Sequence, residues 1–197
     1  GVRALDLFDD DAVSLTNLNR QAVATVDTLG MAKVDAMAAR IAAVAPGARV
    51  EKHRMFYMPE NADGVDLSVY DYIVDAVDTV AAKLELAVRA TALGVPIISA
   101  MGAGNKLDPT KLVIGDIYET SVDPLARVIR RELRKRGVKR LTVAWSTEPP
   151  AAALGALAEE DALHPRRSIP GSTAFVPPAM GLAIAAEVVR ALAGLEG

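Results

Sequence analysis

Alternating strand and helix patterns are the feature that most limits how this chain can fold. Short runs rich in Val, Ile and Leu alternate with longer segments whose apolar residues recur at helical spacing. A strand, a helix and a second strand normally form a parallel βαβ unit, so this alternation predicts a parallel sheet. The predicted strands lie near Val2–Phe8, Ala48–His53, Tyr72–Asp75, Val95–Ala100, Leu112–Tyr118 and Leu141–Trp145. The predicted helices are Lys33–Val44, Val80–Leu93, Pro124–Arg136 and Ala179–Leu195.

The composition fits one domain of this class. The 197 residues are 51% hydrophobic, but only 4% are aromatic, and an aliphatic interior is typical of a helix-covered parallel sheet. The C-terminal apolar segment carries Glu187 and Arg190, so it is expected to pack on the domain and not to enter a membrane. A cytoplasmic location is expected. Residues 147–172 lack periodicity and are predicted to form a long mobile loop.

Polar residues follow several predicted strands, at the edge where a parallel sheet binds its ligands. Asp9 ends the first predicted strand and is placed to accept hydrogen bonds from ribose hydroxyls. Asn17 and Arg20 offer an amide and a guanidinium to phosphate oxygens, and Lys33 adds a point charge. Asp78 is suited to hold Mg²⁺ against those phosphates. Taken singly, each residue is more typical of a solvated turn or a solvent-facing helix position; together they predict an ATP site.

The pair Gly102 and Gly104 also follows a predicted strand, as a dinucleotide-binding loop would. The third glycine of that motif is replaced by Leu107. We therefore predict a tight turn near the substrate end of the crevice.

The predicted helix Pro124–Arg136 combines an apolar face with a dense basic face. Its apolar residues are Leu125, Val128, Ile129 and Leu133. Its basic residues are Arg127, Arg130, Arg131 and Arg134, and Lys135, Arg136, Lys139 and Arg140 extend the patch. A solvated amphipathic helix is the alternative, but Glu132 is the single acid among eight basic residues in a chain of net charge −3. The helix is predicted to bind a nucleic-acid phosphate backbone.

Cysteine is absent from the sequence. Within this chain that excludes a disulfide, a thiolate zinc site and a cysteine nucleophile. Any reaction that passes through a thioester or a persulfide would need a cysteine from outside these residues.

The runs LDLFDDDAVSLTNLNRQ, GMAKVDAMAARIAAVAPGARV and YDYIVDAVDT resemble the ThiF/MoeB/HesA type of ubiquitin-activating-like adenylating enzymes. The resemblance implies a Rossmann-like, doubly wound, mainly parallel α/β fold, ATP and Mg²⁺ as cofactors, and a homodimer. It also implies that Asp9 binds the ribose, that Asn17, Arg20 and Lys33 contact the nucleotide, and that Asp78 is the metal ligand. The catalytic residues would be Arg20, Lys33 and Asp78.

One departure from that family concerns its glycine-rich phosphate loop, which precedes the first strand found here. The chain also lacks an initiator Met and enters a strand pattern by its third residue. We therefore expect residues 1–197 to be a single adenylating domain that lacks its first strand and glycine-rich loop.

Two further runs, SAMGAGNKLDPTKLVIGDIYETSVDPLARVIRRELRKRGVKRL and PGSTAFVPPAMGLAIAAEVVR, are similar to the tRNA threonylcarbamoyladenosine dehydratases. Such enzymes adenylate the carboxylate of the threonylcarbamoyl group on a tRNA adenosine. The carbamoyl group then attacks the activated carbonyl and expels AMP, so the net result is cyclisation with loss of water. The resemblance implies tRNA as partner, with a sulfur-acceptor or cysteine desulfurase protein as a further candidate.

Two alternatives remain open at this point. One is adenylation of the C-terminus of a ubiquitin-like sulfur-carrier protein, which the absence of cysteine disfavours. The other is a binding module without catalytic activity.

Overall fold

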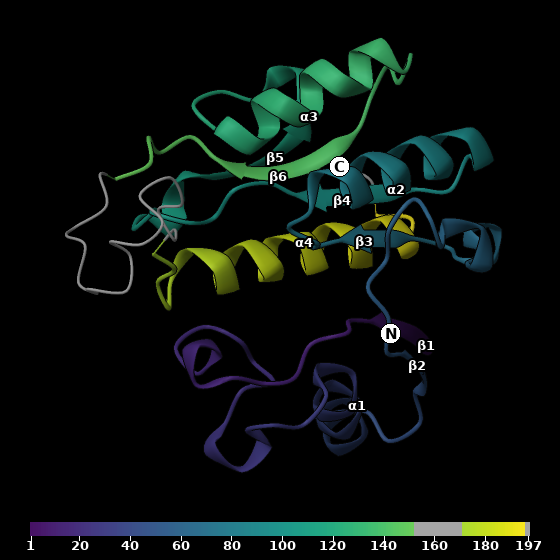
Figure 1. The fold of residues 1–197 in the computed structure, drawn as a ribbon, viewed down its shortest axis with the longest axis vertical. Coiled ribbons are helices and arrows are strands. Elements are labelled where there is room, and N and C mark those ends of the chain that lie inside the picture. Colours follow the sequence, from purple (N-terminus) through teal and green to yellow (C-terminus); the bar gives the residue numbers. More distant parts are fainter. Residues whose placement is uncertain (152–170, 196–197) are drawn as a thin grey trace.

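The fold was obtained as a computed structural model, which describes residues 1–151 and 171–195 (Figure 1). The strands are β1 (Ala4–Phe8), β2 (Arg49–His53), β3 (Ile73–Asp75), β4 (Ile97–Ala100), β5 (Leu112–Asp116) and β6 (Thr142–Ser146). The helices are α1 (Lys33–Val44), α2 (Val80–Leu93), α3 (Pro124–Lys135) and α4 (Val176–Leu192). Short 3₁₀ turns occupy several of the loops between them.

The strands form two separate sheets. β1 and β2 pair in parallel, with Ala4 opposite Arg49. The larger sheet has the order β3-β4-β6-β5, in which β3, β4 and β6 are parallel and β5 runs antiparallel to β6. The predicted α/β fold with a mainly parallel sheet is therefore confirmed.

Helices cover both faces of the larger sheet, as the alternation of its side chains requires. On one face Ile97 and Val143 pack with residues of α2 and α3 in the main core. Their neighbours Ile98 and Ala144 point to the opposite face and pack with Met180 and Ile184 of α4. Because both faces of the central strands are buried, most of their residues are apolar.

Local signals place the helix ends. α1 and α2 have the predicted bounds, and α2 ends at Gly94, whose left-handed backbone (φ +71°) suits glycine. The strand predicted from Val95 begins only at Ile97. The Val95 N–H donates to the Ala90 carbonyl as part of the helix end, and Pro96 has no N–H to donate.

The strand predicted to reach Tyr118 ends at Asp116 instead. The Asp116 carboxylate accepts a hydrogen bond from the Tyr118 N–H (2.8 Å) and begins a 3₁₀ turn, Ile117–Glu119. Of the predicted loop 147–172, residues 152–170 lie outside the described residues. No helix in the part that the structure describes has the length and apolarity needed to cross a membrane.

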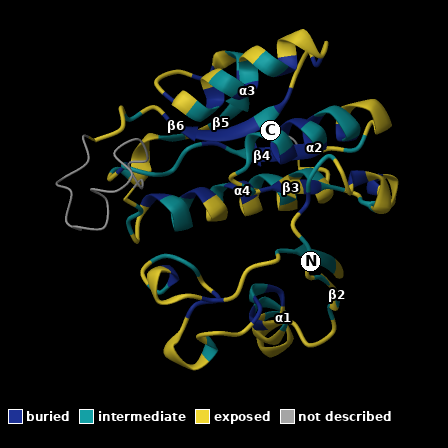
Figure 2. Cartoon of the chain, in the orientation of Figure 1, coloured by how far each residue is buried: buried dark blue, intermediate teal, exposed yellow. Residues whose placement is uncertain are grey.

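The first part of the chain stands apart from the larger sheet. We call residues 1–56, which contain β1, α1 and β2, the N-terminal unit, and the other described residues the sheet body (Figure 1). Burial is concentrated in the sheet body (Figure 2). Two hydrogen bonds that join the parts run from Tyr70 Oη to Asp6 Oδ2 (2.9 Å) and from Asn19 Nδ2 to the Ser172 carbonyl (2.8 Å).

Each part presents an open strand edge to the other. In the described residues β1 pairs only with β2, and β3 pairs only with β4. The exposed side chain of Val74, in the middle of β3, is consistent with an edge that has no neighbour.

Candidate nucleotide-binding site

The predicted ribose ligand and the predicted lysine lie together after β1. Lys33 Nζ is 2.6 Å from Asp11 Oδ2 and 3.6 Å from Asp9 Oδ2. Asp9 Oδ1 accepts a hydrogen bond from the Asp11 N–H (2.9 Å), which leaves Asp9 Oδ2 available. The Asp9 side chain is 37% exposed, so it can accept hydrogen bonds from a ligand.

The loop that follows holds the two predicted phosphate ligands in one turn. Asn17 is buried, and its Oδ1 accepts a hydrogen bond from the Ser14 N–H (3.0 Å). Arg20 Nη1 donates to the Thr16 carbonyl (2.7 Å) and to Asn19 Oδ1 (3.0 Å). These bonds fix both side chains. The Asn17 bond uses only its amide oxygen, and the Arg20 bonds use one nitrogen of a guanidinium that has five N–H groups.

Asp78, the predicted metal ligand, lies in the loop between β3 and α2. Its side chain is exposed and accepts a hydrogen bond from Thr79 Oγ1 (3.3 Å). Within the described residues, no hydrogen bond or ion pair joins Asp78 to Arg20 or Lys33. The structure therefore brings Asp9 and Lys33 together, but leaves Asp78 on the sheet body.

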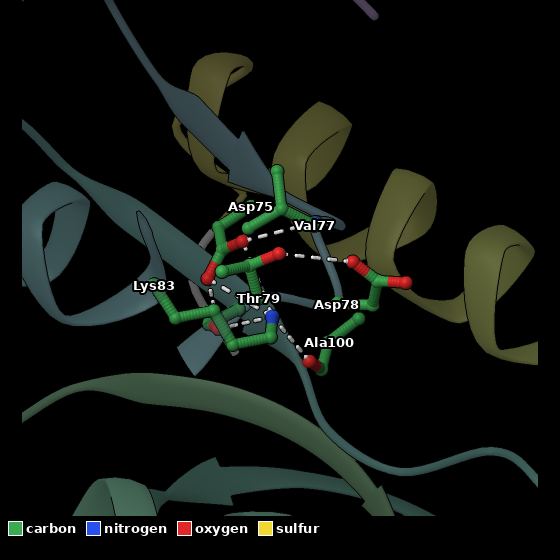
Figure 3. Close-up of polar contacts among 7 residues, drawn as sticks. Asp75, Val77, Asp78, Thr79, Lys83 and Ala100 are labelled. Atoms are coloured by element: carbon green, nitrogen blue, oxygen red, sulfur yellow. Dashed lines mark hydrogen bonds and ion pairs between the residues drawn. The ribbon is translucent and has the colours of Figure 1, made fainter. Parts of the chain in front are cut away.

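A buried ion pair lies beside Asp78 and was not predicted from the sequence. Lys83 Nζ lies 3.1 Å from both carboxylate oxygens of Asp75 and 3.2 Å from Ser99 Oγ (Figure 3). The side chains of Lys83 and Asp75 are 1% and 0% exposed. The available signal was helical spacing, because Lys83 shares a helix face with the buried Ala87 and Ala90.

The glycine pair after β4 forms the predicted tight turn. Gly104 and Asn105 make the turn, and Asn105 has a left-handed backbone (φ 57°). The Gly102 N–H donates to Asp123 Oδ2 (2.9 Å), and a Cβ on Gly102 would lie only 3.1 Å from that carboxylate. Asp123 also caps α3 by accepting from the Ala126 N–H (2.9 Å), so it ties the glycine turn to the basic helix.

The four predicted arginines of α3 divide into two kinds. Arg127, Arg131 and Arg134 are exposed to solvent, and Arg130 is partly buried. Arg130 Nη1 instead donates to the carbonyl and hydroxyl of Thr120 (both 2.6 Å). Arg134 lies over the ring of Tyr118, 5.1 Å from its centre.

Glu132 sits at the centre of the remaining positive charge. It pairs with Arg131, Lys135 and Arg136 at 2.9–3.2 Å, and hydrogen bonds from Lys135, Arg136 and Arg131 lower its pKa to about 2. A shallow hollow of about 350 Å³ beside α3 is lined by Tyr118, Arg134, Gly137, Val138 and Lys139. The patch keeps a net positive charge even though one acid neutralises part of it.

Comparison with known proteins identifies the class. The family model described as "ThiF family" matches residues 1–197. The chain therefore belongs to the ThiF family.

More particular similarities lie within that family. The chain is 39% identical over 198 residues to a tRNA threonylcarbamoyladenosine dehydratase from Bacillus subtilis, which covers 98% of this chain and 78% of that protein. The dehydratase from Escherichia coli has been solved with AMP (TM-score 0.82, 28% identity, 97% of this chain and 76% of that chain). It has also been solved with ATP (TM-score 0.78, 29% identity, 98% of this chain and 78% of that chain).

Proposed function

We propose that this chain is the adenylating domain of an ATP-dependent tRNA threonylcarbamoyladenosine dehydratase. The observation that carries the proposal is the similarity of nearly the whole chain, in sequence and in fold, to enzymes of that name. The reaction activates the threonylcarbamoyl carboxylate with ATP and closes the ring as AMP leaves. It needs no protein nucleophile, because the attacking atom already belongs to the substrate, and a chain without cysteine is suited to it.

The nucleotide would lie between the N-terminal unit and the sheet body. Asp9 Oδ2 accepts from the ribose hydroxyls, while the free N–H groups of Arg20 and the Asn17 amide donate to phosphate oxygens. Lys33 would exchange its exposed partner Asp11 for a phosphate oxygen. Arg20 and Lys33 then stabilise the negative charge that develops at the α-phosphate as the carboxylate adds.

The β3–α2 loop would hold magnesium. Asp78 is exposed and accepts a single hydrogen bond in the described structure, so its oxygens are free to bind a hard cation. The neighbouring Lys83 does not compete for it, since that ammonium is enclosed by Asp75 and Ser99. Magnesium bound there would neutralise charge on the phosphates.

The open edges of β1 and β3 support a further part of the proposal. A strand inserted between them would join the two sheets into one doubly wound sheet. We propose that this strand and the phosphate-binding glycine loop come from a segment outside the described residues. The measurement is nucleotide affinity of the chain with and without its natural preceding sequence, and equal affinities would contradict this part.

The tRNA would bind along α3. The solvent-facing Arg127 and Arg131 and the hollow lined by Arg134 and Lys139 place positive charge beside the helix. Asp123 connects this helix to the glycine turn at Gly102, so bound tRNA would lie next to the substrate end of the site.

We also propose a homodimer in the cytoplasm. The exposed side chains of Phe175, which directly precedes α4, and of Leu182 and Val189 on α4 recur every seven residues and form one apolar stripe. Light scattering of the full-length protein measures the mass, and a monomer at micromolar concentration would contradict the dimer.

The experiment that tests the function is ATP–pyrophosphate exchange by the full-length protein. We expect exchange with threonylcarbamoyl-modified tRNA and none with the same tRNA lacking that group. Mass spectrometry of the nucleosides should show the loss of one water. Exchange that depends on a ubiquitin-like sulfur carrier and not on tRNA would overturn the proposal.

A further inference from the structure

A cluster of buried polar residues in the sheet body lies directly behind the loop that carries Asp78. Asp75 is the last residue of β3, Ser99 lies in β4, and Lys83 lies in the first turns of α2. All three residues are at most 2% exposed. The nucleotide mechanism described above uses none of them.

Lys83 connects three separate segments through one nitrogen. Its Nζ donates to Asp75 at the end of β3, to Ser99 Oγ in β4 and to the carbonyl of Ala100 (2.8 Å), where β4 ends (Figure 3). Ser99 Oγ in turn donates to Asp75 Oδ2. Every polar atom of the cluster therefore has a partner within it, which is the condition for burying charge.

The cluster also determines the path of the Asp78 loop. Asp75 Oδ1 accepts from the Val77 N–H (3.2 Å), so the cluster holds the residue before Asp78. The residue after Asp78 is held by the start of α2, where the Thr79 carbonyl accepts the backbone N–H of Lys83 (3.1 Å). Thr79 Oγ1 then holds Asp78 itself.

Lys83 Nζ also holds the start of the glycine turn after β4, through the Ala100 carbonyl. Ala100 leads directly into Met101 and Gly102, and Gly102 donates to Asp123. A buried ion pair contributes little net stability compared with apolar packing, because both ions lose their water. Here burial lowers the pKa of Lys83, and the charge of Asp75 acts in the opposite direction. Apolar residues at these positions could not hydrogen-bond the Asp78 loop and the end of β4 at the same time, so the role of the pair is to fix the geometry of these two segments.

We propose that Lys83, with Asp75 and Ser99, is a positioning residue that aligns the Asp78 loop with the glycine turn after β4. The inference rests on the proposed function for the role of Asp78, but the alignment itself is a property of the fold. Lys83 would not contact ATP, magnesium or tRNA.

The test compares three variants of the full-length protein: Ser99→Ala, Lys83→Met and the control Lys106→Met. Lys106 is equally buried, but its Nζ donates to the carbonyls of Ser146 (3.1 Å) and Glu148 (2.6 Å), away from Asp78. Ser99→Ala is the mild variant, since it keeps the Lys83–Asp75 ion pair and should remain folded if Lys83→Met does not.

The first measurement is amide hydrogen exchange without any ligand. Ser99→Ala should speed exchange of residues 76–79 and 100–102 by about tenfold, the effect of losing a buried hydrogen bond. Lys83→Met should speed exchange of the same residues by more, because it also lowers the stability of the sheet body. Lys106→Met should speed exchange near residues 146–148 more than at 76–79. In Ser99→Ala, unchanged exchange at 76–79 or a uniform increase over the whole sheet body would overturn the proposal.

The second measurement is the magnesium concentration that gives half-maximal pyrophosphate exchange. It should rise severalfold in Ser99→Ala and stay at the wild-type value in Lys106→Met, whereas loss of stability alone would lower the rate at every magnesium concentration. If the wild-type protein shows no exchange activity, the proposed function fails, and hydrogen exchange still decides the positioning role. Normal magnesium dependence with altered loop exchange would contradict the link to Asp78.

Discussion

The N-terminal unit and the sheet body each hold a lysine against aspartate, but in opposite surroundings. Lys33 is 16% exposed and its partner Asp11 is 65% exposed, whereas Lys83 and Asp75 are enclosed. Water screens the first pair, so it can exchange one partner for another at little cost. The second pair can be broken only by leaving a bare charge in the core. The Lys33 pair is therefore suited to bind a ligand, whereas the Lys83 pair is suited to hold a fixed geometry.

The hydrophobic core of the N-terminal unit is also much smaller than that of the sheet body. The N-terminal unit buries a small cluster, Val13, Val23, Ala24 and Ala36. The sheet body has a large core between its sheet and the helices α2 and α3, and a second cluster under α4. We expect the N-terminal unit to open more readily than the sheet body, because little apolar area holds it closed.

The largest effect should come from breaking the enclosed pair. Lys83→Met leaves Asp75 buried without its partner and should lower the free energy of unfolding by about 3–5 kcal/mol. Lys33→Met should lower it by less than about 1 kcal/mol, because Lys33 is partly exposed and its partner Asp11 is largely exposed. Urea unfolding measures both. Equal losses would remove the contrast between the two lysines.

The next effect is on activity. Here the residues of the N-terminal unit should matter most, although they contribute little to stability. Arg20→Ala and Lys33→Ala should each lower kcat/KM for ATP about 10²–10³-fold, as expected when a charge that stabilises the transition state is removed. The matched control is Lys52→Ala, a surface lysine paired with Asp35. Activity of Lys33→Ala at the level of Lys52→Ala would exclude Lys33 from the site.

The basic helix α3 can be tested by making two Arg→Glu substitutions on it and, as a control, two on the N-terminal unit. Arg127→Glu combined with Arg131→Glu should weaken tRNA binding about 10–100-fold at low salt and reduce the salt dependence of the affinity. Arg40→Glu with Arg49→Glu, on the N-terminal unit, should change the affinity far less. Filter binding over a range of salt concentrations measures both, and an unaltered salt slope for the α3 variant would refute tRNA binding by this helix.

The smallest effect concerns Tyr70, whose hydroxyl joins the two parts through Asp6. Burial, followed by the hydrogen bond to Asp6, raises the pKa of Tyr70 from 10.0 to about 12. Because the folded-state pKa is the higher one, this contribution is fully present below pH 10 and is lost as the pH rises towards 12.

Tyr70→Phe should therefore cost about 1 kcal/mol at pH 8, the net value of one hydrogen bond. The difference from wild type should shrink between pH 10 and 12. Urea unfolding at several pH values measures it, with Tyr118→Phe as the control because Tyr118 bonds the Val138 carbonyl within the sheet body. If the stability difference between Tyr70→Phe and wild type is the same at every pH, the hydrogen bond that the Tyr70 hydroxyl donates to Asp6 is not its source.

Much of the fold could be predicted because its causes are local. The bounds of α1 and α2 follow from apolar spacing and from the glycine after Leu93, all within a few residues. Strand ends were predicted less well. Whether Val95 and Tyr118 extend a strand depends on which acceptor their N–H groups find, and in both cases a turn or helix end takes it.

The candidate site could be predicted only in part. Asp9 and Lys33 were identified as ligands from the sequence, and the structure places them together. All four arginines of α3 were predicted to bind tRNA, and that stays a prediction, but the sequence did not show that Arg130 contacts Thr120 and that Arg134 lies over Tyr118. A helical pattern shows which side of a helix is polar, but not which polar groups a neighbouring segment satisfies.

The sequence by itself determined that this chain forms a helix-covered parallel sheet, that it has no cysteine chemistry of its own, and that its ATP-type motifs follow strand ends. Only the tertiary structure decided that Lys83 is enclosed while Lys33 stays partly exposed beside a largely exposed partner. The reason is the range of the interactions. Lys83 finds Ser99 and Ala100 sixteen and seventeen residues further along the chain, on a strand that reaches it only when the sheet forms.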